Sequence, residues 1–426
     1  MADVRPIHAL HYDLDAVGSL QDVVAPPYDV IDTAMREELL ARSPYNAVAI
    51  DLPKPYGETG PQAEGAGDPY AAAAESIEAW QLAGALVKDG EPAIWAMEQE
   101  YTGPDGGSHV RHGILARVRV EDFDTGTILP HERTLPGPKQ DRLELMRATR
   151  CNLSPIFSLS TIDPWPLAAK ETAVEDPWGE ATDAAGTVTR VWRLPQLNED
   201  VPRLLADAQL LIADGHHRYE TAIAYRDEIG GEGDHNFTLM ALTGLDDPGL
   251  SVYPTHRLLS GFADDPERQR RLGEGLRELF EIEEVATDRV DPLGEDGVGV
   301  FGLYDSHHKQ AFRLRLKGTA ELDRQLAGQP EAYRRLDAAI LETLVLKGLA
   351  GLDEDDILAK RGIGYAKSVE DSLRLIEDGT YDVAFILRPI PVQQTKEICE
   401  SDANMPPKST YFYPKVLTGL VFNPLS

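Results

Sequence analysis

The amino-acid sequence predicts an α+β protein built on a mixed sheet with flanking helices. Three observations lead to this fold class. Apolar runs of strand length alternate with segments of helical periodicity, a glycine turn joins one strand directly to a helix, and the pattern changes beyond residue 260. A chain of 426 residues is long enough for two or three domains. We therefore expect a first domain over residues 1–260 and a second, smaller α/β domain over residues 261–426.

The elements of the first domain follow from periodicity and from turn residues. The Gly- and Pro-rich residues 57–69 lack periodic apolar positions and predict a loop. The apolar strand Leu210–Ala213 runs through a glycine turn into helical spacing at Tyr219–Ile229, which predicts a strand–turn–helix unit. The other expected elements are a helix over Tyr70–Leu86, strands over Ala93–Glu100 and Gly113–Val120 joined by a turn at Gly103–Gly107, a helix over Arg142–Ala148 and a strand over Ile156–Leu159.

The second domain mixes helices and strands in the same way. An apolar stripe at helical spacing over Tyr333–Leu349 predicts a helix that packs on a core. The remaining expected elements are a charged helix over Asp264–Glu283, a hairpin of Val298–Tyr304 with Gln310–Leu316, helices over Val369–Glu377 and Val392–Glu400, and strands over Val383–Leu387 and Thr418–Phe422.

Charge and composition exclude several function classes. Lys and Arg number 41 against 72 Asp and Glu, a net charge of −31, which repels nucleic-acid phosphates and anionic lipids. No apolar stretch reaches the roughly 18 residues of a membrane span. No signal peptide is visible, and two cysteines, Cys151 and Cys399, are too few for a disulfide framework. We expect a cytoplasmic protein without nucleic-acid or membrane partners, and a homo-oligomer is compatible with the sequence. The acidity fits a halophilic host and an ordinary acidic bacterial protein equally.

The strongest chemical signal is Asp214-Gly215-His216-His217-Arg218. A glycine turn that opens a helix aims backbone N–H groups and the positive helix end at one point, which suits a phosphate. His216, His217 and Arg218 add cationic or hydrogen-bonding side chains, and Asp214 could orient an imidazole or hold a magnesium ion. The alternative is that Asp214 only caps the helix and the histidines pack.

A second cluster is Pro130-His131-Glu132-Arg133-Thr134, followed by Lys139, Asp141 and Arg142. The proline before it and Pro136-Gly137-Pro138 after it favour a loop in which His131 and Glu132 converge. Glu132 could then act as a general base, and Lys139 and Arg142 could bind a substrate carboxylate or a phosphoryl group. The alternative is a solvated charged loop.

A third candidate is the segment Met405–Lys415. Lys408 and Lys415 stand out in an acidic, lysine-poor chain and could bind an anion. We expect the segment to fold back onto the first domain and close a cleft, with Lys408 near Gly215–Arg218, because ligand sites favour domain boundaries. The alternative is a packed terminal strand whose lysines extend to solvent.

Several separated motifs, in one order, carry a family resemblance. The chain resembles the bacterial and archaeal domain-of-unknown-function family number 1015 over nearly its whole length. The motifs are Ala25-Pro26-Pro27-Tyr28-Asp29-Val30, Pro130-His131-Glu132 with Lys139 and Asp141-Arg142, Asn152-Leu153-Ser154-Pro155-Ile156, Asp214–Arg218, Pro254-Thr255-His256-Arg257 and Met405–Lys415.

The segment Asp214–Arg218 with its following helix also looks like the corresponding turn of ParB/sulfiredoxin-like proteins. That group includes nucleotide-dependent free-serine kinases and DNA-partition nucleotide-binding proteins. The likeness covers a small part of the chain. It implies that Gly215 to Arg218 embrace nucleotide phosphates and that Asp214 lies close to the transferred group or its metal ion.

The leading hypothesis is a small-molecule phosphotransferase that acts from ATP or ADP, with Mg²⁺, on a hydroxylated metabolite such as free L-serine. Glu132 is the first choice for the base and Asp214 the second. One rival is a nucleotide-binding regulatory module without turnover. Another is a metal-dependent phosphoesterase with His131, Glu132, His216 and His217 as ligands.

Overall fold

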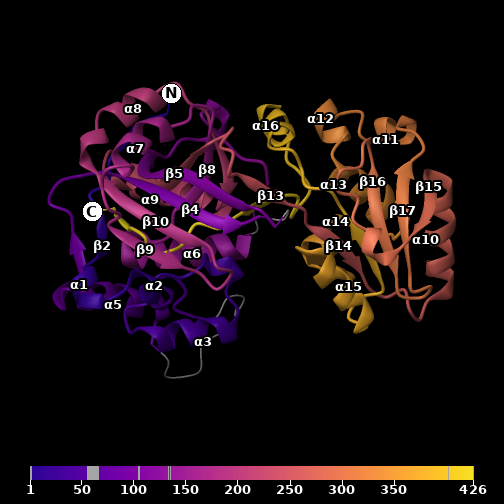
Figure 1. Cartoon of the computed structure of the whole chain (residues 1–426), viewed down its shortest axis with the longest axis horizontal. Coiled ribbons are helices and arrows are strands. Elements are labelled where there is room, and N and C mark those ends of the chain that lie inside the picture. Colours follow the sequence, from indigo (N-terminus) through magenta and orange to yellow (C-terminus); the bar gives the residue numbers. More distant parts are fainter. Residues whose placement is uncertain are drawn as a thin grey trace. The chain divides into compact units, whose positions relative to one another are not determined.

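The computed structural model describes residues 2–54, 67–103, 106–132, 134, 136–401 and 403–425. The chain forms two compact units, which Figure 1 shows in sequence colours. Unit 1 comprises Met1–Pro130, Thr134–Ser251 and Pro414–Ser426, and unit 2 comprises His131–Arg133 and Val252–Tyr413. This grouping differs from a division after residue 260, because the last residues lie in unit 1 and a short segment near residue 131 lies in unit 2.

Unit 1 is built on a nine-stranded sheet of order β6-β11-β8-β12-β5-β4-β10-β9, with β1 on β5. The pairs β11–β6 and β12–β8 are parallel and the others antiparallel. The predicted mixed sheet is therefore confirmed. Its strands are β1 (Val4–Arg5), β4 (Ile94–Thr102), β5 (Ser108–Arg119), β6 (Ile128–Leu129), β8 (Ile156–Ser160), β9 (Gly179–Thr182), β10 (Val188–Leu194), β11 (Leu210–Asp214) and β12 (Phe237–Gly244).

Successive side chains of a strand point to opposite faces of the sheet, so alternate residues identify the face that packs in the core. On β5, Ile114, Ala116 and Val118 are fully buried in one apolar cluster with Tyr219 and Ala222 of the helix after β11. The helices of unit 1 are α1 (Leu14–Val17), α2 (Leu20–Val23), α3 (Thr33–Arg42), α4 (Val48–Asp51), α5 (Pro69–Leu82), α6 (Pro136–Thr149), α7 (Trp165–Thr172), α8 (Asp200–Leu205) and α9 (His216–Ile229), with 3₁₀ turns η1 (Tyr28–Val30), η2 (Phe123–Thr125), η3 (Pro195–Leu197) and η4 (Asp234–Asn236).

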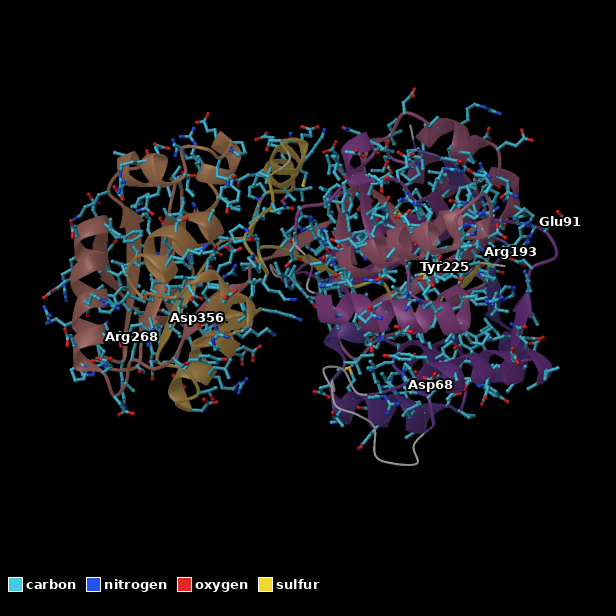
Figure 2. The ribbon with its side chains drawn as sticks, turned by 180° about the vertical axis from the view of Figure 1, so that it is seen from behind. Asp68, Glu91, Arg193, Tyr225, Arg268 and Asp356 are labelled. Carbon is cyan, nitrogen blue, oxygen red and sulfur yellow. The ribbon has the colours of Figure 1, made fainter. Side chains whose placement is uncertain are left out.

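Helix starts in both units follow local capping chemistry. Asp68 accepts a 3.0 Å hydrogen bond from the N–H of Tyr70 and begins α5. In unit 2, Asp353 and Asp356 form a reciprocal capping box at the start of α14 (Glu354–Leu358). Figure 2 labels Asp68 and Asp356 among the side chains. Residues 57–66 of the predicted loop, and residues 104 and 105 of the predicted hairpin turn, lie outside the described residues.

The C-terminal residues belong to unit 1. Thr418 forms a backbone bridge with Ala25, and Phe422 forms one with Leu10. The predicted strand over Thr418–Phe422 is wrong, because these residues make isolated bridges instead of a continuous ladder. Two small sheets complete the unit, β2 (Leu10–Tyr12) with β3 (Leu86–Lys88) and β7 (Cys151–Asn152) with β21 (Asn423–Pro424).

Unit 2 contains a six-stranded antiparallel sheet of order β15-β17-β16-β19-β14-β18. The predicted hairpin is present as β16 and β17. The smaller α/β unit expected from the sequence is confirmed. Its strands are β14 (His256–Leu259), β15 (Phe280–Val285), β16 (Val300–Asp305), β17 (Gln310–Leu316), β18 (Ile363–Ala366) and β19 (Val383–Ile386), and β13 (Ser251–Tyr253) pairs with β20 (Tyr411–Tyr413).

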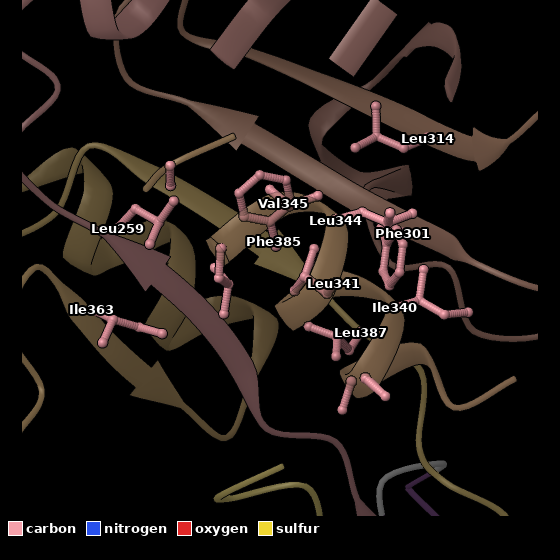
Figure 3. Close-up of a cluster of buried hydrophobic side chains, with 14 of the residues drawn as sticks. Leu259, Phe301, Leu314, Ile340, Leu341, Leu344, Val345, Ile363, Phe385 and Leu387 are labelled. Carbon is pink, nitrogen blue, oxygen red and sulfur yellow. The ribbon is translucent and has the colours of Figure 1, made fainter. Parts of the chain in front are cut away.

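Leu259, Phe301, Leu341 and Phe385 are fully buried in the largest core of unit 2, which Figure 3 shows in close-up. The predicted single helix over Tyr333–Leu349 is wrong, because Leu336 is extended (ψ 120°) and divides it. The helices are α10 (Pro266–Leu279), α11 (Ala320–Gln325), α12 (Glu331–Arg334), α13 (Asp337–Ile340), the π-helical η6 (Leu341–Lys347), α14, α15 (Val369–Glu377) and α16 (Val392–Glu400), with a 3₁₀ turn η5 (Thr287–Arg289).

The loop predicted around Pro136-Gly137-Pro138 is also wrong in its second half. These residues form the first turn of α6, which runs from Pro136 to Thr149. Proline is tolerated there because the first N–H groups of a helix have no partner inside it. Lys139 therefore lies on a helix and not in a loop, and Arg142 lies on the helix predicted over Arg142–Ala148.

No helix among the described residues is long and apolar enough to cross a membrane.

Candidate functional site

The candidate site lies at the turn between β11 and α9 in unit 1. The predicted strand–turn–helix unit is confirmed, since β11 ends at Asp214 and α9 begins at His216. Gly215 has φ 102°, a left-handed conformation that favours glycine. A Cβ on Gly215 would lie 2.9 Å from Nε of Arg218, so glycine also lets this side chain fold back over the turn. The N-cap residue of α9 is Gly215 itself, which has no side chain to cap the first N–H groups of the helix.

Asp214 is the negative centre of this turn. Its Oδ2 accepts a 2.6 Å hydrogen bond from Nη2 of Arg218, and its Oδ1 accepts one from Nζ of Lys415. Burial by itself would raise the pKa of Asp214. The charges of Lys415 and Arg218 outweigh burial, and they hold this pKa well below its usual range. Asp214 is therefore an ionised carboxylate between two cations. It does not cap α9, so the alternative of a simple capping residue is wrong.

Arg218 points into the protein. Its Nη1 donates to Oγ of Ser154 at 3.0 Å and to the carbonyl oxygen of Pro155. The residue is 9% exposed. The expectation that Arg218 faces a ligand and not the core is therefore wrong. A guanidinium has five N–H donors, and here most of them hold β11, α9 and the segment before β8 together.

A chain of buried hydrogen bonds continues from Ser154. Thr418 Oγ1 donates to Ser154 Oγ at 2.9 Å and lies 3.4 Å from Oδ2 of Asp51. Arg142 Nη1 donates to the carbonyl oxygen of Asp51 at 2.6 Å. Arg142 is 5% exposed, and its guanidinium lies 4.3 Å from the ring centre of Tyr28. Arg142 is therefore a buried structural residue, and the substrate-binding role predicted for it disagrees with this position.

This network contains residues that the sequence analysis missed. Asp51 and Thr418 connect the Arg142 and Arg218 groups, but neither stands in a cluster of polar residues along the chain. Burial raises the pKa of Asp51, although Arg142 acts against this effect. A small cavity of about 40 Å³ lies among Asp51, Arg142, Ser154 and Arg218. Tyr28 of the motif Ala25–Val30 contributes its ring, over which the Arg142 guanidinium lies.

Lys139 lies on the first turns of α6, where α6 packs on α9. Its Nζ lies 2.7 Å from Oε2 of Glu220, which also accepts a 2.8 Å hydrogen bond from Thr134. The Lys139 side chain is 36% exposed. Lys139 is thus near the N-terminal half of α9 and accessible, with its charge partly neutralised by Glu220.

His216 and His217 occupy the first turn of α9. His216 is buried, and its ring acts on Asp214 to favour the carboxylate. His217 is half-buried, and its carbonyl oxygen accepts a 2.7 Å hydrogen bond from Thr221.

The second predicted cluster lies in unit 2. His131 Nε2 is 2.9 Å from Oγ1 of Thr410, and the backbone N–H of Lys408 donates to Oε1 of Glu132 at 2.9 Å. Lys408 has φ 58° and an exposed side chain. Arg257 is buried nearby and donates to the carbonyl oxygen of Pro407 at 3.1 Å. Burial lowers the pKa of Arg257. Arg133 lies outside the described residues.

The predicted site residues thus divide into groups. Asp214 to Arg218 lie beside Lys415 in unit 1. Lys139 and Arg142 also belong to unit 1, but they lie on α6. His131, Glu132 and Lys408 gather in unit 2. Lys415 was predicted as an anion-binding residue of the same site as Asp214, and their ion pair places them together. The proximity of Lys408 to Gly215–Arg218 and the cleft stay predictions.

A magnesium ion at Asp214 does not fit these surroundings. Both carboxylate oxygens already accept from cationic groups, and a divalent cation would face two positive charges. No group of three or more His, Cys, Asp or Glu side chains in the described part of the chain is arranged to hold a metal. The ligand set of the phosphoesterase hypothesis is also divided between the two units.

A larger cavity of about 560 Å³ lies elsewhere in unit 2, between α10 and the sheet. Leu272, Leu276 and Phe312 line it, with His307 and His308 among its polar residues. None of the predicted site residues lines this cavity.

His256 in the motif Pro254–Arg257 of unit 2 makes stability depend on pH. Its Nδ1 accepts from the N–H of Leu387 at 3.2 Å, and the residue is 1% exposed. Burial, and then Arg257, lower the pKa of His256 to about 4 from 6.5. The unfolded chain therefore binds a proton that the folded chain does not bind, and stability falls as the pH drops below the unfolded pKa.

We expect His256 to cost unit 2 about 2 kcal/mol between roughly pH 7 and pH 5. The variant His256→Asn keeps an acceptor for Leu387 and removes the titration, so its calorimetric unfolding profile should lose this part of the pH dependence. Identical pH profiles for both proteins would contradict the assignment.

The chain matches the model of the family described as "Protein of unknown function (DUF1015)" over residues 4–339. It belongs to this family, as its motifs predicted. No match was found among curated proteins.

Solved structures give weaker similarities. A conserved hypothetical protein from Pyrococcus furiosus is 17% identical, with 70% of this chain and 90% of that chain covered and a TM-score of 0.35. A mutant free serine kinase in complex with ADP is 17% identical, with 70% and 87% covered and a TM-score of 0.36. SbnI with a C-terminal truncation, from Staphylococcus aureus, is 11% identical, with 71% and 85% covered and a TM-score of 0.36.

Proposed function

We propose that unit 1 binds the phosphate groups of a nucleotide at the turn between β11 and α9. One observation carries this proposal. Lys415 and Arg218 bring two positive charges to one carboxylate, Asp214, at the N-terminus of α9, in a chain whose net charge is −31. A local excess of positive charge in such a chain attracts anions, and the helix end adds N–H donors for oxygen atoms. The likeness of Asp214–Arg218 to the turn of ParB/sulfiredoxin-like proteins favours a nucleotide.

The residues of this site have different tasks in the proposal. Lys415, whose side chain is 14% exposed, contacts a phosphate oxygen together with the N–H groups of the first turn of α9. Asp214 is a positioning residue, because it holds Lys415 and Arg218 in place. Gly215 leaves room for the Arg218 side chain to fold back over the turn. Lys139 is accessible on α6 and supplies a further cation.

We further propose that the chain is a phosphotransferase that acts from ATP or ADP on a small hydroxylated metabolite, such as free L-serine. The reaction needs positioned phosphates and a carboxylate that accepts the hydroxyl proton. The cationic turn supports the first requirement. Glu132 is the proposed base, and Asp214 is the weaker candidate, since both of its oxygens are occupied by cations.

A nucleotide-binding module without turnover is the second candidate. The same observation about Asp214 favours it, because the carboxylate of the turn is not available to take a proton. Release of ADP or AMP in the presence of hydroxy-amino acids separates the two candidates. Binding without product release would support the regulatory module.

The experiment for the binding site compares Lys415→Met with the wild type by calorimetric titration of AMP, ADP and ATP. Loss of the ammonium leaves Arg218 and Asp214 to cancel one another, so we expect nucleotide affinity to fall by about tenfold or more. Adenosine, which has no phosphate, should bind neither protein detectably.

Lys170→Met is the matched control. Lys170 is an exposed lysine on α7, so this variant has the same change in net charge without a change at the turn. Equal nucleotide affinities for Lys415→Met and Lys170→Met would contradict the proposed site.

A further inference from the structure

Arg111 is a fully buried arginine on β5 that forms no ion pair with a carboxylate in the described part of the chain. It is 0% exposed, and Nη2 donates to Oε1 of Gln99, the residue opposite it on β4. Its Nε and Nη1 have no hydrogen-bond partner among the described residues. Removing a guanidinium from water is costly unless it is paired, so this arrangement reduces stability. A fold keeps such a residue when another requirement depends on its charge.

Contacts connect Arg111 to the site at β11 and α9. Gln99 Nε2 donates at 3.1 Å to the carbonyl oxygen of Lys415, whose ammonium holds Asp214. The Arg111 guanidinium also lies 4.3 Å from the ring centre of Phe157, and Phe157 is the strand partner of Asp214. Gln99 therefore connects Arg111 to Lys415, and Phe157 connects it to the strand position of Asp214.

The charges that face Arg111 do not neutralise it. Burial lowers its pKa to about 10, and Tyr101, Asp247 and Asp214 act in the opposite direction. Asp247 already lies 3.1 Å from the ring of His112 and accepts from the N–H of Gly249 at 2.9 Å. Asp214 is bound by Arg218 and Lys415.

Arg111, Arg218 and Lys415 carry three positive charges and Asp214 one negative charge, so these four side chains sum to +2, while Asp247, which also acts on Arg111, is bound to His112 and to the N–H of Gly249. We propose that Arg111 is a positioning residue that fixes Lys415 through Gln99 and supplies the third positive charge, which makes this site selective for a phosphate dianion over a carboxylate monoanion. This inference rests on the proposed phosphate site and adds the charge of its ligand, a dianion. An adjacent carboxylate ligand of charge −1 would leave one buried positive charge without compensation.

The test uses the full chain with Arg111→Met, which has a similar length and no charge. Because an unpaired buried charge is removed, we expect the midpoint of thermal unfolding to stay equal or rise. Affinity for AMP and for inorganic phosphate should fall by roughly tenfold or more, while binding of acetate stays weak in both proteins. Arg111→Lys, which keeps the charge, should retain most of the AMP affinity.

Arg117→Met is the matched control on the same strand. Arg117 pairs with Asp234 at 2.6 Å and lies outside the site, so this variant loses the same charge and should bind AMP as the wild type does. A lower unfolding midpoint with unchanged AMP affinity in Arg111→Met would overturn the inference and assign Arg111 to the fold alone. A wild type that binds neither AMP nor phosphate would instead overturn the proposed function.

Discussion

Replacement of Arg218 by alanine lowers the free energy of unfolding of unit 1 by about 3–5 kcal/mol, the usual result when one partner of a buried ion pair is removed. Arg218 is bound to Asp214 at 2.6 Å and to Ser154 at 3.0 Å. In Arg218→Ala the carbonyl oxygen of Pro155 loses this donor, and Asp214 loses one of the two cationic groups that donate to it. Each buried polar group left without a partner adds to the cost.

Tryptophan fluorescence during urea unfolding measures this effect in unit 1 specifically. All five tryptophans of the chain belong to that unit: Trp80, Trp95, Trp165, Trp178 and Trp192. Arg190→Ala is the control, because Arg190 contacts Glu98, Glu100 and Glu180 on a partly exposed surface. Its loss should cost about 1 kcal/mol or less. Equal unfolding midpoints for the two variants would contradict the buried network.

Replacement of Glu132 by glutamine removes most turnover if Glu132 is the base. The amide oxygen of glutamine can still accept from the N–H of Lys408, which donates to Glu132 Oε1 at 2.9 Å. The fold and nucleotide binding should therefore persist, whereas the proton acceptor is lost. We expect turnover to fall by about 10²–10⁴-fold with hydroxy-amino acids as acceptors, measured by release of ADP or AMP.

Glu397→Gln provides the comparison for this variant, since Glu397 is exposed on α16 in the same unit. It should turn over at the wild-type rate. Full activity in Glu132→Gln would refute the assignment of the base. Reduced nucleotide affinity in Glu132→Gln would show that the residue acts in binding and not in proton transfer.

The local parts of the site could be predicted from the sequence because short-range chemistry determines them. An apolar strand of four to five residues that reaches a glycine before a helical pattern favours a turn there, and Gly215 adopts the left-handed conformation that glycine permits. The helices α15 and α16 have the predicted bounds because their apolar positions recur at helical spacing. The family was also evident from motifs that keep one order along the chain.

The sequence could not show which polar side chains are buried in the folded protein. Arg218 and Arg142 look like surface or ligand-binding cations in an acidic chain, yet both are buried with internal partners. Whether such a side chain is buried depends on hydrogen-bond partners that lie far away from it in the sequence. Thr418 joins Ser154 and Asp51 across more than two hundred residues, a pairing that no periodicity reveals.

The sequence by itself determined the family, the mixed α/β class and the strand–turn–helix unit at Gly215, because motifs, periodicity and glycine conformation act over a few residues. Only the tertiary structure decided that Lys415 holds Asp214, that Arg111 stays buried behind them, and that Glu132 belongs to unit 2. The physical reason is that the charge state and accessibility of a side chain depend on what surrounds it in space. The C-terminal residues pack into unit 1, and this packing brings the cation to the turn.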